Sequence, residues 1–102
     1  MTLREKQSKF VRMIAVLIEW ASKNGYDLTF GESYNAAKIG HMENSLHYIR
    51  LAQDFNVFRK GKWLQDGNDF IDLGEFWESI GGSWGGRWKD GNHFSIEHEG
   101  RK

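Results

Sequence analysis

The chain has 102 residues, which is enough for one domain and too few for two independent cores, so we expect a single domain over residues 1–102. Fourteen Lys and Arg balance fourteen Asp and Glu, and this net charge of zero lacks the basic excess typical of nucleic-acid-binding proteins. The chain contains no Cys, which excludes disulfides and thiolate metal sites. Any metal must therefore be bound by His nitrogen and carboxylate oxygen atoms.

The apolar segments are short. The longest, Met13 to Trp20, is interrupted by Glu19 and falls short of the roughly 20 residues that span a bilayer. The first residues carry charges of both signs and no long apolar segment with a cleavage site. We therefore expect no membrane partner, no signal peptide, and folding in the cytoplasm.

The N-terminal segment has the pattern of an amphipathic helix over residues 3–23. Thr2 and Glu5 have the spacing of a capping box, and Asn24-Gly25 is a typical helix end. Between them, apolar residues recur at steps of three and four, which predicts one buried face: Phe10, Ile14, Leu17 and Ile18.

The remaining elements are predicted to be shorter. Residues 34–45 lack a clear period and are expected to be mostly loop, and residues 45–51 a short helical turn. Alternating or β-rich composition predicts strands at residues 26–33, 53–58, 62–64 and 93–98, with Lys60-Gly61 as a hairpin turn. The apolar positions of residues 69–80 predict a second helix that ends at Gly81-Gly82, although Gly74 weakens it. The sum is a small α+β domain with an antiparallel sheet.

Histidines and carboxylates gather in two stretches, residues 45–54 and 90–98. Strand alternation places Asp54 on the face opposite Phe55, and it separates His93 from His98. His47, Asp54 and His93 would supply the two nitrogens and one oxygen of a catalytic zinc site, in which bound water becomes a nucleophile near neutral pH. Alternatively, His47 is a hydrogen-bonded structural histidine and Asp54 a solvated strand residue.

Two neighbouring carboxylates have possible roles beside these three residues. Asp90, three residues before His93, is the candidate general base and acid, which would take the proton of the water and pass it to the leaving amine. Glu97 shares the predicted face of His93, so it is either an outer hydrogen-bond acceptor that orients a ligand or an exposed ion-pair partner.

The two stretches resemble a known family signature. It consists of Ser-x-His-x6-Asp with Ala two residues before the Asp, and an acidic residue three before the last His; this chain has Ser45, His47, Ala52, Asp54, Asp90 and His93 in those places. The signature is similar to that of the zinc D-Ala-D-Ala dipeptidase and carboxypeptidase family (peptidase family M15), which includes phage L-alanyl-D-glutamate endopeptidases. Residues 44–58, 73–79 and 84–98 resemble small phage endolysins in particular.

The resemblance implies a fold and a site. The fold would be a small antiparallel sheet with helices packed on it, as in hedgehog/DD-peptidase-like proteins. Zn²⁺ would be bound by His47, Asp54 and His93, with Asp90 as the general base and acid. The chain departs from the family at Arg50, where Gly is common, and at Asn35, where an Arg commonly follows the upstream Tyr. The remaining candidates for substrate contacts are Tyr34, Ser45, Arg50 and Trp88.

The resemblance also implies a function and a setting. We expect a monomeric zinc peptidase that cuts the stem peptide of bacterial peptidoglycan, between L-Ala and D-Glu, as an antimicrobial bacteriophage endolysin. Such an enzyme is made in the host cytoplasm and acts on the cell wall after release. Three alternatives stay open: a D-Ala-D-Ala carboxypeptidase, a non-catalytic zinc-containing cell-wall-binding domain, and a structural adaptor without metal.

Overall fold

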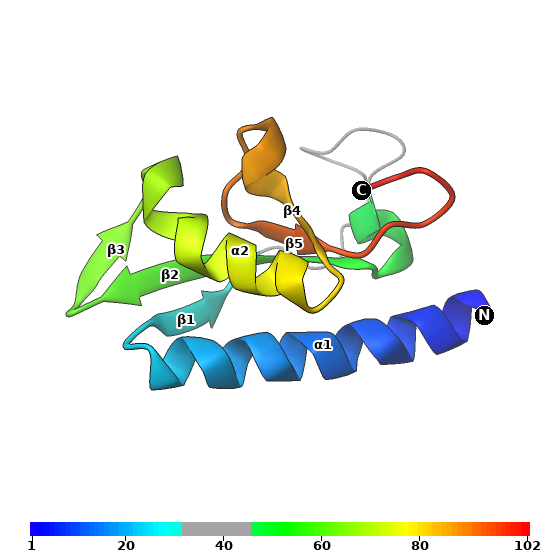
Figure 1. Cartoon of the computed structure of the whole chain (residues 1–102), viewed down its shortest axis with the longest axis horizontal. Helices are drawn as coiled ribbons and strands as arrows, with labels where there is room; N and C mark the ends of the chain where they lie inside the picture. Colours follow the sequence, from blue (N-terminus) through cyan, green and yellow to red (C-terminus); the bar gives the residue numbers. More distant parts are fainter. Residues whose placement is uncertain (32–45) are drawn as a thin grey trace.

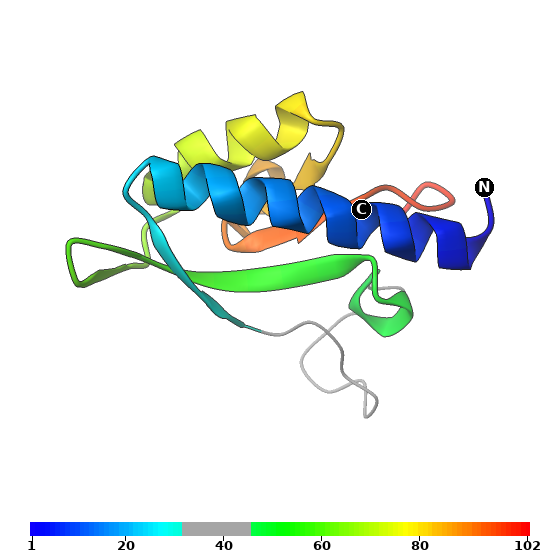
Figure 2. The ribbon, with the colours of Figure 1, turned by 90° about the horizontal axis from the view of Figure 1, so that it is seen from below.

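The computed structural model describes residues 1–31 and 46–102. Two α-helices, three short 3-10 helices and a five-stranded antiparallel sheet make up this part of the chain, so the predicted α+β class is confirmed (Figure 1). Helix α1 (Leu3–Lys23) lies along one side of the sheet with α2 (Ile71–Ser79) beside it (Figure 2). Neither helix is long and apolar enough to cross a membrane.

Helix α1 has the predicted bounds and the predicted cap. The Thr2 hydroxyl accepts a hydrogen bond from the Glu5 N–H, and the Glu5 carboxylate accepts one from the Thr2 N–H. Ile18 is the exception to the predicted apolar face, because it is 38% exposed. One residue after Leu17, it is rotated by about 100° from the buried row, which comprises Phe10, Met13, Leu17 and Ala21.

The sheet has the strand order β1-β2-β5-β4, with β3 paired to β2. The longest strand, β2 (Ala52–Arg59), pairs with β1 (Asp27–Phe30) and β5 (His93–Ser95), and β4 (Ser83–Trp84) pairs with β5. The predicted hairpin is confirmed: β3 (Lys62–Leu64) returns along β2 after Lys60 and Gly61, both at positive φ. The predicted strand 26–33 is four residues long in the described part.

Two predicted elements have different bounds in the structure. The second helix starts as a 3-10 turn, η2 (Gly67–Phe70), because the Asp66 carboxylate caps the Asn68 N–H, and it continues as α2. The predicted strand 93–98 ends at Ser95. Its partner β2 begins at Ala52, opposite Ser95. Past that pair, a backbone hydrogen bond joins the Ile96 N–H to the Leu51 carbonyl, and the chain then turns into a hairpin closed between His98 and Arg101.

The helices cover one face of the sheet, and the candidate metal ligands of β2 and β5 lie on the other. Phe55 and Phe94 point toward the helices, where the Trp77 ring packs edge-on against Phe94 and Phe10 at centroid distances of 6.1 and 5.9 Å. Alternation along β2 and β5 therefore turns Asp54 and His93, which are cross-strand partners, to the opposite face.

Gly74 is required in α2 by its contact with Trp84. A Cβ atom on Gly74 would lie 2.0 Å from Cδ2 of the Trp84 indole, which is buried and cannot move freely. We expect Gly74→Ala to lower the free energy of unfolding by about 1–3 kcal/mol through overpacking. Urea unfolding would measure this. Gly67→Ala is the matched control, because a Cβ there meets nothing within 4 Å. Equal stability of the two variants would contradict the expectation.

Candidate metal centre and adjoining groove

Three short elements bring the candidate ligands together. Asp54 in β2 lies directly opposite His93 in β5. His47 belongs to the 3-10 helix η1 (Leu46–Ile49), which is held against β2 by the buried side chains of Leu46 and Leu51 and by the hydrogen bond from the Leu51 N–H to the Leu46 carbonyl. The turn thus places His47, which precedes Asp54 by seven residues, beside the Asp54 carboxylate.

The three side chains converge on one point. Oδ1 of Asp54 lies 3.2 Å from Nε2 of His47 and 3.3 Å from Nδ1 of His93. One ligand atom from each residue lies within 4.8 Å of the other two. His47 and His93 are buried and the Asp54 side chain is 16% exposed, so the donors are largely shielded from water.

This geometry fits a metal ion. In a tetrahedral zinc site with bonds of about 2.0–2.1 Å, neighbouring ligand atoms are about 3.3–3.4 Å apart. Both distances to Asp54 Oδ1 agree with that edge length. Among the described residues, Asp54 Oδ1 is also a buried atom without a hydrogen bond of acceptable geometry. A buried acceptor left in that state costs about 1–3 kcal/mol, and a cation at the point of convergence would satisfy it.

The Asp54 carboxyl is held in its charged form. Burial raises its pKa, but the interactions with His47 and His93 outweigh this effect and lower the pKa of Asp54 from 3.8 to about 2. Asp54 is therefore a carboxylate at neutral pH. A metal ligand has to be deprotonated, so its charge state suits the proposed role.

Asp90 stands at the edge of this site. Its Oδ2 atom lies 3.8 Å from Nδ1 of His93, and its side chain is 48% exposed. The Asp90 N–H donates to the Gly85 carbonyl at 2.8 Å, and the His93 N–H donates to the Asp90 carbonyl at 3.1 Å. A Cβ on Gly85 would lie 2.2 Å from the Asp90 carbonyl oxygen, so the absence of a side chain there permits the tight turn that aims both residues at the site.

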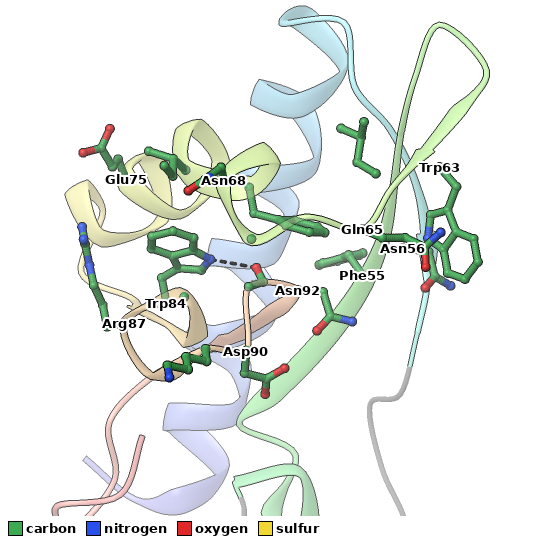
Figure 3. A pocket seen from close by; sticks show the side chains of 17 residues that line it. Phe55, Asn56, Trp63, Gln65, Asn68, Glu75, Trp84, Arg87, Asp90 and Asn92 are labelled. Carbon is green, nitrogen blue, oxygen red and sulfur yellow. Dashed lines mark hydrogen bonds between the residues drawn. The ribbon is translucent and has the colours of Figure 1, made fainter.

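A groove of about 820 Å³ begins beside Asp90 (Figure 3). The β2–β3 hairpin forms one wall through Asn56 and Trp63, and the other wall contains Trp84 and Arg87. The Trp84 N–H donates to the Gly91 carbonyl at 2.8 Å, which ties this wall to the Asp90–His93 turn. Amide side chains and aromatic rings together make a lining suited to a peptide.

The other predicted residues have different outcomes. Trp88, 42% exposed in the 3-10 helix η3 (Gly85–Trp88), has its ring centroid 5.7 Å from that of His93, at the edge of the site. Tyr34 and Ser45 lie outside the described residues, as do Asn35 and His41. His98 faces away from the site, with Nδ1 3.1 Å from Nζ of Lys6 in α1.

The sequence patterns did not predict which group contacts Nε2 of His93, the ring nitrogen that faces away from Asp54. Glu97 is exposed, and the atom that contacts His93 Nε2, at 3.1 Å, is the main-chain carbonyl oxygen of Lys102. Every residue has a carbonyl, so no side-chain pattern pointed to this one. The only local signal was Gly100, which permits the chain to turn back.

Arg50 has the backbone conformation that glycine adopts most easily, with φ of 57°. The left-handed backbone conformation costs an L-amino acid about 1–2 kcal/mol. Glycine adopts it without this cost but loses more conformational entropy on folding, so Arg50→Gly is expected to raise the free energy of unfolding by about 0.5–1 kcal/mol. If the Arg50 side chain binds substrate, activity falls at the same time. Lys60→Gly, at φ of 51° in the distant hairpin turn, should give the same stabilisation with unchanged activity. Unchanged activity in Arg50→Gly would remove Arg50 from the substrate-contact set.

Comparison with known proteins identifies a peptidase family. A family model described as D-alanyl-D-alanine carboxypeptidase matches residues 39–96, more than half of the chain. This range contains His47, Asp54, Asp90 and His93. A search of curated proteins finds no match.

Proposed function

The chain belongs to the D-alanyl-D-alanine carboxypeptidase family of peptidases (M15), and on that premise we propose that it is a zinc metallopeptidase that hydrolyses a bond in the stem peptide of bacterial peptidoglycan. The observation that carries the proposal is the convergence of His47, Asp54 and His93, with one ligand atom of each within 4.8 Å of the others, beside a half-exposed Asp90. An open groove begins beside Asp90.

The proposed roles follow from position and charge. His47 offers Nε2, His93 offers Nδ1 and Asp54 offers a carboxylate oxygen to the ion. Zinc bound there would supply Lewis acidity and lower the pKa of a water molecule to about 7. Catalytic zinc sites have three protein ligands and keep a further position for water, and the half-exposed Asp90 at the edge of the site marks the side from which water and substrate would reach it.

Asp90 is the proposed proton carrier. Its carboxylate lies next to the metal ligands without being one of the three converging groups. Partial exposure gives it access to both the attacking water and the substrate. It would accept the proton of that water and then deliver it to the nitrogen of the leaving amine. An intact Asp90 in this position supports an enzyme over a non-catalytic zinc-binding domain.

The groove supports a peptide substrate. Asn56, Asn68 and Asn92 line it and offer both donors and acceptors to a peptide backbone, while the exposed Trp63 offers apolar contact. Its position beside Asp90 would place one side of the scissile bond in the groove. The partner that we propose is therefore the peptide portion of peptidoglycan.

We favour cleavage between L-Ala and D-Glu over removal of terminal D-Ala. A carboxypeptidase needs a cation to bind the terminal carboxylate of its substrate. The chain has Asn35 where the family commonly has an Arg. Two cations line the groove, and one of them, Arg87, is engaged in a two-bond ion pair with Glu78, at 2.9 and 2.7 Å, which leaves Lys89. The family description favours the carboxypeptidase, which is therefore the second candidate.

Cleavage mapping tests the proposal. Zinc-loaded protein would be incubated with purified muropeptides that carry complete stem peptides, and the products would be identified by mass spectrometry. A new amino terminus at D-Glu is expected. Loss of a single terminal D-Ala would establish the carboxypeptidase instead. Intact muropeptides after incubation with zinc-containing protein would contradict an enzymatic function and favour a binding domain.

A further inference from the structure

The groove that begins beside Asp90 also reaches Trp63, an exposed indole on the β2–β3 hairpin (Figure 3). Trp63 is 52% exposed, although an indole is among the largest apolar groups in a protein. A second exposed indole, Trp88, lies against the His93 ring at a centroid distance of 5.7 Å and belongs to the metal centre. Trp63 lies apart from that centre, and a flat ligand that covered its ring would remove apolar surface from water.

The strand register places Trp63 on the same face of the sheet as the metal ligands. Trp63 pairs with Phe58, which is itself partly exposed. Alternate residues of a strand point to the same face, so Phe58 shares the face of Asp54 and Asn56. At about 3.4 Å per residue, the aromatic pair of Phe58 and Trp63 lies about 13–14 Å from Asp54 along β2. The open face therefore leads from the metal centre, past an amide, to two aromatic rings.

The groups around the aromatic pair suit a sugar ring. Asn56 and Gln65 line the groove on the same hairpin, and each amide both donates and accepts hydrogen bonds. A pyranose ring has flat faces made of C–H groups, which stack on the negative face of an aromatic ring, and a rim of hydroxyl and acetamido groups that amides bind. The small and acidic side chains of a stem peptide offer no flat apolar face of this size.

We propose that Trp63, together with Phe58, is a subsite for a sugar ring of the peptidoglycan glycan strand. The proposal rests on the proposed function, in which the bond after L-Ala is cut. This L-Ala is attached through a lactyl group to an amino sugar of the strand, and these two units span about 7 Å when extended. The adjoining sugar rings would cover the remaining distance from the metal centre to the aromatic pair.

Binding of a sugar chain alone tests the proposal without zinc or hydrolysis. The probe is the tetramer of β-1,4-linked N-acetylglucosamine, which shares the backbone of the glycan strand and carries no stem peptide. In ¹H–¹⁵N NMR spectra of the full chain, the indole N–H signal of Trp63, assigned by its absence in Trp63→Phe, should shift and saturate as the tetramer is added. Trp63→Ala should weaken binding, followed on the backbone amides of the hairpin, by about 3–10-fold. Trp63→Phe, which keeps a ring, should weaken it less.

Phe30→Ala is the matched control for the loss of an exposed ring. Phe30 is 71% exposed in β1, and as the cross-strand partner of Phe55 it belongs to the opposite face of the sheet. Its alanine variant should bind the tetramer as tightly as the wild type.

Hydrolysis provides a second readout, the ratio of kcat/KM for a disaccharide-linked stem peptide to kcat/KM for the same peptide without sugar. The ratio should exceed one in the wild type, because only the first substrate reaches the aromatic pair. It should fall by about 3–10-fold in Trp63→Ala and keep its wild-type value in Phe30→Ala.

The outcomes distinguish this inference from the proposed function. Equal affinity of the wild type and Trp63→Ala for the tetramer, or no shift of the Trp63 signal, would overturn the sugar subsite. An equal fall in kcat/KM on both substrates in Trp63→Ala would assign the ring to the peptide and would overturn it as well. A protein that binds the tetramer through Trp63 but leaves muropeptides intact would support the subsite and contradict the proposed peptidase.

Discussion

Replacement of Asp90 by asparagine is expected to lower the rate of peptide hydrolysis by about 10²–10⁴-fold, the usual contribution of a general acid–base group. The amide has nearly the shape of the carboxylate but cannot accept the proton of the attacking water at neutral pH. Zinc content should not change, because Asp90 Oδ2 is 3.8 Å from the nearest ligand nitrogen and the three converging donors remain. Steady-state kinetics on stem peptides, together with metal analysis, would measure both effects.

Asp69→Asn is the control for this variant. Asp69 is an exposed carboxylate in η2, outside the lining of the groove. It undergoes the same chemical change and should keep wild-type activity. Asp90→Asn protein that hydrolyses peptide at the wild-type rate would show that another group carries the proton.

Replacement of Asp54 by asparagine is expected to remove most of the stabilisation by zinc. A ligand that binds only the folded state, at a concentration of about 1,000 times its dissociation constant, raises the free energy of unfolding by about 4 kcal/mol. For a domain of this size that corresponds to a rise in Tm of roughly 15–30 °C. Asp54→Asn removes the negative charge at the point where His47 and His93 converge, so most of this rise should disappear. Thermal unfolding with and without zinc measures the difference.

The control for the second variant is Asp27→Asn on the neighbouring strand β1. Asp27 is exposed and lies opposite Phe58, away from Asp54 in the register of β2. Its asparagine variant should show the full rise in Tm with zinc. An equal rise in Asp54→Asn would place the stabilising ion elsewhere in the molecule.

Local patterns predicted those parts of the fold that local interactions determine. The capping pair Thr2 and Glu5 and the three- and four-residue steps to Leu17 defined α1 correctly, because capping and helix periodicity act within a few residues. Strand alternation correctly set Phe55 apart from Asp54, since successive side chains of a strand point to opposite faces. The meeting of His47, Asp54 and His93, by contrast, was expected from family resemblance and strand pattern together.

Features that depend on distant contacts were not predictable. Gly74 weakened the predicted second helix, yet the Trp84 ring ten residues later occupies the space where its Cβ would lie. The predicted last strand was too long, because its end depends on where the partner strand begins. The contact of the Lys102 main-chain oxygen with His93 depends on a turn that returns the chain to β5. Each of these features is a tertiary contact, for which one sequence has no local pattern.

Anomalous diffraction at the zinc absorption edge, from crystals of the zinc-loaded protein, would show directly whether zinc binds to His47, Asp54 and His93. One strong peak is expected about 2.0–2.2 Å from His47 Nε2, His93 Nδ1 and an Asp54 carboxylate oxygen, with Asp90 beside it and not coordinated. A folded protein with no zinc peak, or with zinc bound only by other residues, would contradict the assignment of this site and the peptidase mechanism built on it.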